Sequence, residues 1–250
     1  MVAERAFELL HRRGIGIEAG LASTGYISSR QIATALFLAA QAIRGGLADC
    51  TIALGFEKMK PGSLESVYND RAQPMEKHVL ALAEISEVLF PVAPWMFGAA
   101  GREHMEKYGS KPEHFAWIGY KNHKHSVNNP YAQFQDEYTL QEIQDAREVY
   151  APLTKLQCSP TSDGAGASIV ASEKFVDEHD LWDRAIEITG QALVTDTRAT
   201  FDDDSAISLV GYEMSRLAAE QALNEAGTGI DEVDVVELHD CFSANELITY

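Results

Sequence analysis

The sequence is poor in cysteine, in basic side chains and in long apolar runs, and each shortage excludes a class of protein. Its three cysteines, Cys50, Cys158 and Cys241, form no CxxC pair, so neither a disulfide framework nor a zinc knuckle is indicated. Lys and Arg number 20 against 38 Asp and Glu, and the net charge of -18 opposes nonspecific binding to nucleic acid or anionic lipid. No apolar run reaches the length of a membrane helix, and residues 1–5 lack the layout of a signal peptide. We therefore expect a reducing, cytoplasmic location and neither a nucleic-acid nor a membrane partner.

The sequence has the composition of an ordinary globular protein, and helix and strand patterns alternate along it. Hydrophobic residues make up 46% and charged residues 23%. Apolar residues recur at helical spacing from Ile32 to Ile43, and Gly45-Gly46 supplies a stop. Strand patterns occupy four further segments, namely 50–56, 165–171, 185–189 and 233–238. The alternation predicts two α/β halves, separated by a Pro-containing, charged and aromatic excursion between Glu57 and Gln157.

Acidic side chains and a hydroxyl precede the last long helical pattern. Asp202-Asp203-Asp204 and Ser205 come before an apolar stripe from Ile207 to Ala218, which Gly227 closes. Negative charge is favourable at a helix N-terminus, so we interpret the three aspartates as loop and helix-end charge and not as a metal site.

The last segment sets an imidazole, a carboxylate and a thiol after the apolar run 233–238. His239, Asp240 and Cys241 follow this expected buried strand, and Ser243 is the expected cap of a helix that 245–250 only begins. Reactive side chains at strand ends are typical of open α/β sheets. Because so short a helix carries no stop signal, we expect an incomplete chain.

Four runs together resemble the thiolase domain of the sterol carrier protein x type. They are ALGFEKM at 53–59, HKHSVNNP at 123–130, PTSDG at 160–164 and HDCF at 239–242. The likeness extends from about Thr34 to Tyr250. It implies the α/β thiolase fold, layered αβαβα from two related βαβ halves, with a helical insertion and truncation at both ends. The implied domains are part of the N-terminal half at 1–57, the helical insertion at 58–157, the end of the N-terminal half at 158–180 and the start of the C-terminal half at 181–250.

The resemblance implies Claisen chemistry on acyl-CoA thioesters. In this family a cysteine takes the acyl group of a 3-ketoacyl-CoA, acetyl-CoA leaves, and coenzyme A collects the shortened chain. The family's pattern assigns the thioester oxyanion to His239 and acid-base work to Cys241. Cleavage beside a thioester does develop charge on oxygen, so a preplaced donor such as His239 would favour the transition state. Cys241 could deliver the proton if its pKa moved from about 8.5 toward the working pH. The alternative is a buried structural thiol and a histidine satisfied by backbone.

Three further residues take family positions. Ser29 stands where the nucleophilic cysteine belongs, but a serine hydroxyl is far less acidic than a thiol, and a plain helix N-cap is the interpretation we favour. Ser159 occupies the place of a serine near the pantetheine arm of coenzyme A, with an ordinary turn hydroxyl as the alternative. His125, with Lys121 and Lys124, is expected in a basic surface that receives the CoA phosphates, or on a plain solvated face.

We expect acyl-CoA and coenzyme A as substrates, no cofactor or metal, and a homodimeric parent protein in the cytoplasm, or in peroxisomes if eukaryotic. Two histidines two apart share a face only on a strand, which argues against a metal at His123 and His125. Because Ser29 replaces the thiol and the family's Gly-His-Pro turn would lie beyond Tyr250, we expect this chain alone to be inactive. The rivals are a nucleophile-lacking protein that binds acyl-CoA or acts as a retro-aldolase, and a noncatalytic scaffold subunit.

Overall fold

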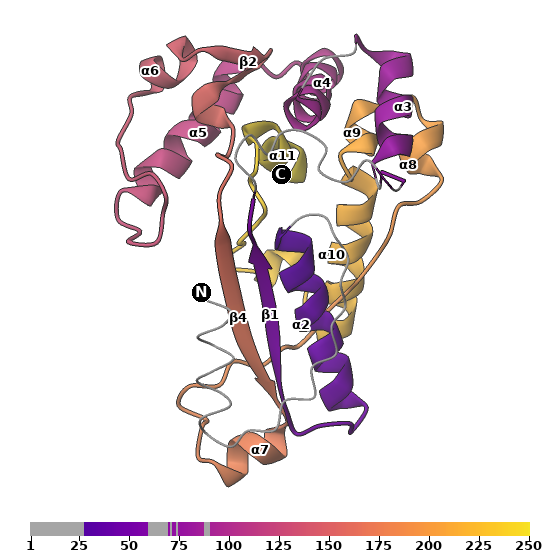
Figure 1. The fold of residues 1–250 in the computed structure, drawn as a ribbon, viewed down its shortest axis with the longest axis vertical. Coiled ribbons are helices and arrows are strands. Elements are labelled where there is room, and N and C mark those ends of the chain that lie inside the picture. The colour runs from indigo at the N-terminus through magenta and orange to yellow at the C-terminus, as the bar shows by residue number, and fades with distance from the viewer. Residues whose placement is uncertain (1–27, 60–69, 71, 74, 88–90) are drawn as a thin grey trace. The chain divides into compact units, whose positions relative to one another are not determined.

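The computed structural model describes residues 28–59, 70, 72–73, 75–87 and 91–250, grouped in two compact units (Figure 1). The first unit holds the described residues within Met1–Ser63 and Thr161–Leu193, and the second those within Leu64–Pro160 and Val194–Tyr250. Among all of these residues, no helix combines the length and the apolar character needed to cross a membrane.

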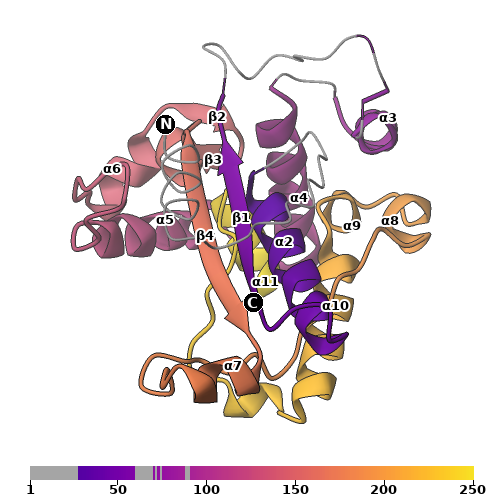
Figure 2. The same cartoon turned by 60° about the horizontal axis from the view of Figure 1, so that its bottom comes forward.

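The first unit is a two-stranded antiparallel sheet with a helix along one face (Figure 2). Its elements are α2 (Ser28–Arg44), β1 (Cys50–Glu57), β4 (Gly164–Ala171) and α7 (Glu173–Glu178). The strands pair in continuous register, from Cys50 opposite Ala171 to Glu57 opposite Gly164. The helix ends at Arg44, and Gly46 follows with a φ of 68°, a conformation that glycine adopts without strain.

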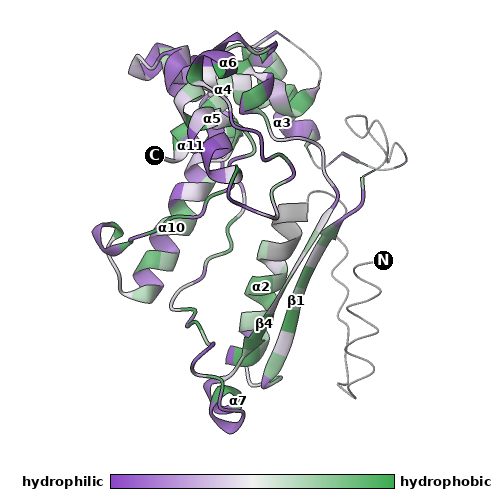
Figure 3. Ribbon diagram, turned by 90° about the vertical axis from the view of Figure 1, so that its left-hand side faces the viewer, coloured by the Kyte–Doolittle hydropathy of each residue, from purple (hydrophilic) through white to green (hydrophobic). Residues whose placement is uncertain are grey.

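Side-chain alternation explains why this sheet forms. Ala53 of β1 and Val170 of β4 point into a small core that Ala39 and Ala40 of α2 complete. On the opposite face Ile52 lies across from Ile169, and both side chains are exposed. Apolar colouring follows α2 and β1 in Figure 3. One face of the sheet is therefore buried by α2, as a period of two residues requires.

The second unit is mainly helical. Its elements are α3 (Glu76–Ile85), α4 (Val92–Tyr108), α5 (Pro112–Ser126), α6 (Leu140–Asp145), β2 (Glu148–Tyr150), β3 (Leu153–Thr154), a 3-10 turn at Lys155–Gln157, α8 (Ala199–Asp202), α9 (Ala206–Leu209), α10 (Tyr212–Ala226), a second 3-10 turn at Ile230–Glu232, and α11 (Ser243–Thr249). The predicted domain boundaries at 57/58, 157/158 and 180/181 stay predictions.

A glycine in α4 allows the Tyr150 side chain to pack directly against this helix. A Cβ added to Gly98 would stand 2.1 Å from Cδ1 of Tyr150, so no larger side chain fits there without movement. Trp95, Ala99 and Leu82 share the same core with residues of α9. The carboxylate of Glu103 joins α4 to α9, because it accepts hydrogen bonds from the Ser205 hydroxyl at 2.6 Å and the Ile207 amide at 3.0 Å.

Two of the four predicted strands are confirmed and two are wrong. The segments 50–56 and 165–171 form β1 and β4. The segments 185–189 and 233–238 are irregular, and Ile186, Val235 and Val236 are 93%, 78% and 62% exposed. No strand of the described residues pairs with either segment, and an apolar segment without a hydrogen-bonding neighbour cannot form a sheet.

The helical predictions near the C-terminal end are partly confirmed. Ser205 caps its helix as predicted, accepting from the Ser208 amide at 3.2 Å, and Gly227 closes α10 with a φ of 66°. The predicted single helix is divided into α9 and α10, because Gly211 adopts a φ of 98°. The prediction of Ser243 as a cap is wrong: Ser243 is the first helical residue of α11, and no hydrogen-bond partner for its buried hydroxyl is present among the described residues.

Candidate active site

The turn 239–242 leads directly into α11, and its side chains differ in exposure. His239 and Asp240 are exposed, Cys241 is partly buried, and Phe242 is buried. The Phe242 ring stacks on Phe97 of α4, with 4.7 Å between centroids. An apolar anchor thus fixes one end of the turn, while the imidazole of His239 stays accessible.

Backbone hydrogen bonds connect this turn to the segment that carries Ser159. The Ser159 amide donates to the Cys241 carbonyl at 2.8 Å, and Cys158 forms a single antiparallel bridge with Phe242. Ser159 is exposed beside Cys241, so two of the predicted site residues lie next to each other. Their roles stay predictions.

A buried carboxylate on α11 organises the surroundings of the turn. Glu246 is 1% exposed and accepts hydrogen bonds from the Lys121 ammonium, the Tyr250 hydroxyl and the Asn122 amide, the last at 3.2 Å. Lys121 also lies 3.0 Å from the Tyr250 oxygen. Buried carboxylates require such partners, so these groups of α5 and α11 form one connected set.

Two asparagine side chains connect that set to the turn itself. The Asn122 amide nitrogen lies 2.8 Å from Oδ2 of Asp240, in addition to its hydrogen bond to Glu246. From α11, the Asn245 amide donates to the His239 carbonyl. The turn is consequently held from two helices.

The thiols of Cys241 and Cys158 have raised pKa values and are protonated at neutral pH. Burial, with a smaller contribution from the Asp240 charge, raises the pKa of Cys241 to about 12, and burial raises the pKa of Cys158 to about 11. The sequence-based condition that the surroundings lower the pKa of Cys241 is therefore wrong, because an apolar cluster with Phe115, Leu153 and Phe242 packs against the thiol. At neutral pH this side chain is therefore protonated.

The charged pair next to the turn keeps both of its charges. Burial opposes ionisation of Glu246, but hydrogen bonds from Lys121, Tyr250 and Asn122 outweigh it and lower the pKa of the carboxyl. Burial also opposes the charge of Lys121, and the hydrogen bonds with Glu246 and Tyr250 reverse this effect, so the pKa of Lys121 is raised.

The histidines of α5 do not form a common site. His125 is exposed, whereas the His123 ring donates from Nε2 to the Leu156 carbonyl at 3.0 Å and contacts Tyr138 edge-on. The expectation that Lys121 belongs to an open basic surface is wrong, because its ammonium is engaged with Glu246. Lys124 and His125 remain exposed on α5. Within the described part of the chain, no three His, Cys, Asp or Glu side chains group as metal ligands.

The first unit contains the other two motif runs and Ser29. Asp163, at the start of β4, pairs with Lys58 and accepts from the Met59 amide at 2.8 Å, which ties the run 160–164 to the run 53–59. Ser29 is the second residue of α2, so the interpretation of Ser29 as the N-cap of this helix is wrong. Its side chain falls outside the described ones.

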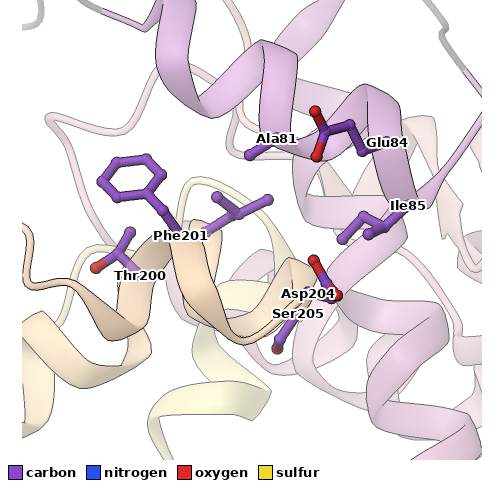
Figure 4. A pocket seen from close by; sticks show the side chains of 8 residues that line it. Ala81, Glu84, Ile85, Thr200, Phe201, Asp204 and Ser205 are labelled. Carbon is purple, nitrogen blue, oxygen red and sulfur yellow. The ribbon is translucent and has the colours of Figure 1, made fainter.

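A small pocket lies within the second unit. It is formed by α3, α8 and α9, and Glu84, Thr200, Phe201 and Asp204 contribute to its wall (Figure 4). None of the predicted site residues is among the described residues that line it.

Sequence patterns missed Asn122 and Asn245, which hold the turn, and the set that Glu246 forms with Lys121 and Tyr250 behind Asn122. The spacing of Glu246 and Tyr250, four apart on one helical face, is a signal for their mutual contact. No signal in a single sequence pairs Lys121 with Glu246, because they are 125 positions apart.

Comparisons with known proteins agree with the motif runs. The family described as "Thiolase, N-terminal domain" matches residues 28–174. The sterol carrier protein 2 of Rattus norvegicus is 57% identical over 218 residues, which make up 87% of this chain and 40% of that protein. The chain thus spans about two fifths of that relative's length. The predicted resemblance to the sterol carrier protein x type is confirmed.

Two solved structures share the fold. One titled "Ltp2-ChsH2(DUF35) aldolase" matches with a TM-score of 0.71 and 21% identity, covering 97% of this chain and 61% of that one. The human mitochondrial 3-ketoacyl-CoA thiolase matches with a TM-score of 0.59 and 17% identity, covering 88% of this chain and 60% of that one. These likenesses confirm the predicted fold class.

Proposed function

The chain belongs to the thiolase family, and we propose that it takes part in thiolytic cleavage of 3-ketoacyl-CoA to acetyl-CoA and a shortened acyl-CoA. Family membership supports an acyltransferase in general terms. The observation that carries the finer proposal is the turn 239–242, which presents an exposed imidazole and a protonated thiol beside Ser159. Breakdown of fatty acids or sterol side chains is the proposed setting.

His239 stabilises the charge that cleavage creates. When a nucleophile adds to C3 of a 3-ketoacyl-CoA and keeps the acyl group, the C2–C3 bond breaks. Its electron pair moves to C2 and onto the thioester oxygen, which becomes an enolate oxygen. A hydrogen bond from the His239 ring to that oxygen lowers the energy of the transition state more than that of the bound substrate. Exposure of the ring supports this role.

Cys241 supplies the proton that completes acetyl-CoA. Its thiol transfers hydrogen to C2 of the enolate, and the thiolate left behind recovers a proton from the thiol of the incoming coenzyme A. The side chain begins protonated at neutral pH, as the first step requires, but burial raises the pKa of Cys241 to about 12 and so makes the thiol a weaker acid than a free cysteine. In the reverse direction the thiolate removes a proton from C2.

The test measures exchange of the C2 hydrogens of acetyl-CoA with deuterium from solvent, catalysed by the purified chain. This partial reaction needs the oxyanion donor and the base but no nucleophile. We expect the rate to rise about tenfold per pH unit as the thiolate fraction grows. His239→Ala should lower it about 100-fold or more, and Cys241→Ala by about 100-fold to 10,000-fold.

Matched controls use the same residue types away from the turn. Cys50→Ala and His179→Ala change exposed side chains of the first unit and should leave the exchange rate as it was. Exchange that survives both His239→Ala and Cys241→Ala, or that never exceeds the protein-free rate, would refute the proposal.

Retro-aldol cleavage is a second candidate, favoured by Ser29 at the place of the nucleophilic cysteine. Here the 3-hydroxyl of a 3-hydroxyacyl-CoA loses its proton, C2–C3 breaks, and the same enolate leaves a free carbonyl compound. A solved structure with an aldolase title has the same fold. The two reactions separate cleanly, because only thiolysis of a 3-ketoacyl-CoA consumes coenzyme A. With Ser29 in place, we expect no thiolysis of acetoacetyl-CoA by this chain.

We further propose acyl-CoA and coenzyme A as the partners, no cofactor, a homodimeric parent protein, and a cytoplasmic or peroxisomal location. The exposed Lys124 and His125 on α5 support contact with CoA phosphates through charge. Their joint replacement by Ala should weaken binding of coenzyme A more than binding of pantetheine, which lacks the nucleotide phosphates.

A further inference from the structure

We propose that Asn122 is a positioning residue, whose amide holds the Asp240 carboxylate and thereby sets the turn that carries His239 and Cys241. This inference rests on the proposed function of that turn. It assigns no contact with substrate to Asn122, which acts through Asp240.

The Asn122 amide has the right chemistry to stand between two carboxylates. Its two hydrogens are directed to Oδ2 of Asp240 at 2.8 Å and Oε2 of Glu246 at 3.2 Å. An aspartate at this position would add a third negative charge, and a lysine would compete with Lys121 for Glu246. A neutral donor with two hydrogens satisfies both acceptors at once.

The amide is itself fixed in direction. Glu246 is buried on α11 and receives Lys121 and Tyr250 through its other oxygen, so the oxygen that faces Asn122 cannot turn away without losing those partners. Asn122 and Lys121 are neighbours on α5. The position of Asp240 is therefore determined by packed helices and not by the exposed turn alone.

Fixing Asp240 has an electrostatic consequence at the neighbouring thiol. The titratable groups placed around Cys241 are His239 and Asp240 in the turn and Cys158 across the backbone bridge, with Glu246 and Lys121 one hydrogen-bonded step farther. Burial contributes most to the raised pKa of Cys241, and the Asp240 charge adds to it. A carboxylate released into solvent would be better screened from the thiol.

The experiment follows alkylation of Cys241 by iodoacetamide as a function of pH, with each cysteine quantified separately by mass spectrometry. At a pH below the thiol pKa, we expect Asn122→Ala to raise the rate at Cys241 about tenfold, which corresponds to one pKa unit. Asp240→Asn, which keeps an acceptor but removes the charge, should give a similar rise. Adding Asn122→Ala to Asp240→Asn should give no further rise.

The alkylation rate at Cys158 separates positioning from simple loosening, because Cys158 forms a backbone bridge with Phe242 of the same turn. A rise at Cys241 with an unchanged rate at Cys158 supports the proposal, whereas equal rises at both thiols, or no change at all, overturn it. Gln141→Ala is the matched control, since it removes an amide hydrogen bond of 2.9 Å to Asp145 between two exposed side chains of α6. Alkylation requires no turnover, so failure of the proposed function would appear in the acetyl-CoA exchange and not in this profile.

Discussion

Two sets of ionic hydrogen bonds in the second unit use the same side-chain chemistry in different surroundings. On α10, Arg216 pairs with Glu213 and Glu220, and all three side chains remain in contact with water. Between α5 and α11, Lys121 pairs with Glu246, which is almost completely buried. The first set joins neighbours of a single helix, whereas the second joins helices 125 positions apart in sequence. Burial and chain separation, and not the number of charges, decide which set maintains the tertiary structure.

The largest expected effect comes from removing the buried carboxylate. Glu246→Ala deprives Lys121, Asn122 and Tyr250 of their common acceptor, and we expect the free energy of unfolding to fall by about 2 kcal/mol. This is below the usual range for a broken buried pair, because the Lys121 side chain is 40% exposed and regains water. Urea unfolding measures the loss. Glu220→Ala on α10 is the matched control, and an equal loss in both variants would contradict the comparison.

Acid unfolding should separate the two sets next. The pKa values of Glu246 and Glu213 are both lowered. In Glu246 burial opposes this shift and the hydrogen bonds from its partners outweigh burial, whereas in Glu213 the hydrogen bond from Arg216 is the main cause. A lowered folded-state pKa gives stability that is present above the ordinary carboxyl pKa of about 4.3 and is lost as the pH falls through the folded-state value. In a plot of the free energy of unfolding against pH, Glu246→Gln should therefore reduce the slope of the acid limb. Glu213→Gln should leave that limb nearly unchanged, and a larger effect of Glu213→Gln would contradict this ordering.

The smallest expected effect belongs to Arg216. Arg216→Ala removes both ion pairs of α10, and exposed pairs of this spacing contribute about 0.3 to 0.5 kcal/mol each. Thermal unfolding followed by circular dichroism should show a shift close to the error of measurement. Raising the salt concentration in the parent chain should reproduce that shift, since exposed pairs are screened. A loss comparable to that of Glu246→Ala would remove the distinction between the two sets.

Local patterns predicted the elements whose partners are nearby. The helix α2 and the strands β1 and β4 are predictable because one face of each is apolar, and the packing of α2 on the sheet uses those faces. The segments 185–189 and 233–238 have similar patterns but lie exposed. Alternation identifies the side that a strand would bury, but it says nothing about whether a second strand is available.

The candidate site likewise contains residues that the sequence predicted and residues that only the structure reveals. His239, Cys241 and Ser159 were reached through the resemblance, and Ser159 does lie against Cys241. The residues that hold the turn were not reached, because Asn122 and Glu246 look like ordinary helical polar residues until α5 and α11 are packed together. A hydrogen bond across such a separation is a property of the folded chain and leaves no local pattern.

The amide shared between Asp240 and Glu246 restricts how this region can change in evolution. Replacing Asn122 alone leaves two acidic side chains without their common donor. Replacing either acid alone leaves the Asn122 amide with one of its two hydrogen bonds. Substitutions tolerated at one of these three positions should therefore arrive with compensating changes at the others. Across divergent relatives the three should vary as a correlated set, while Arg216 and its exposed partners drift independently.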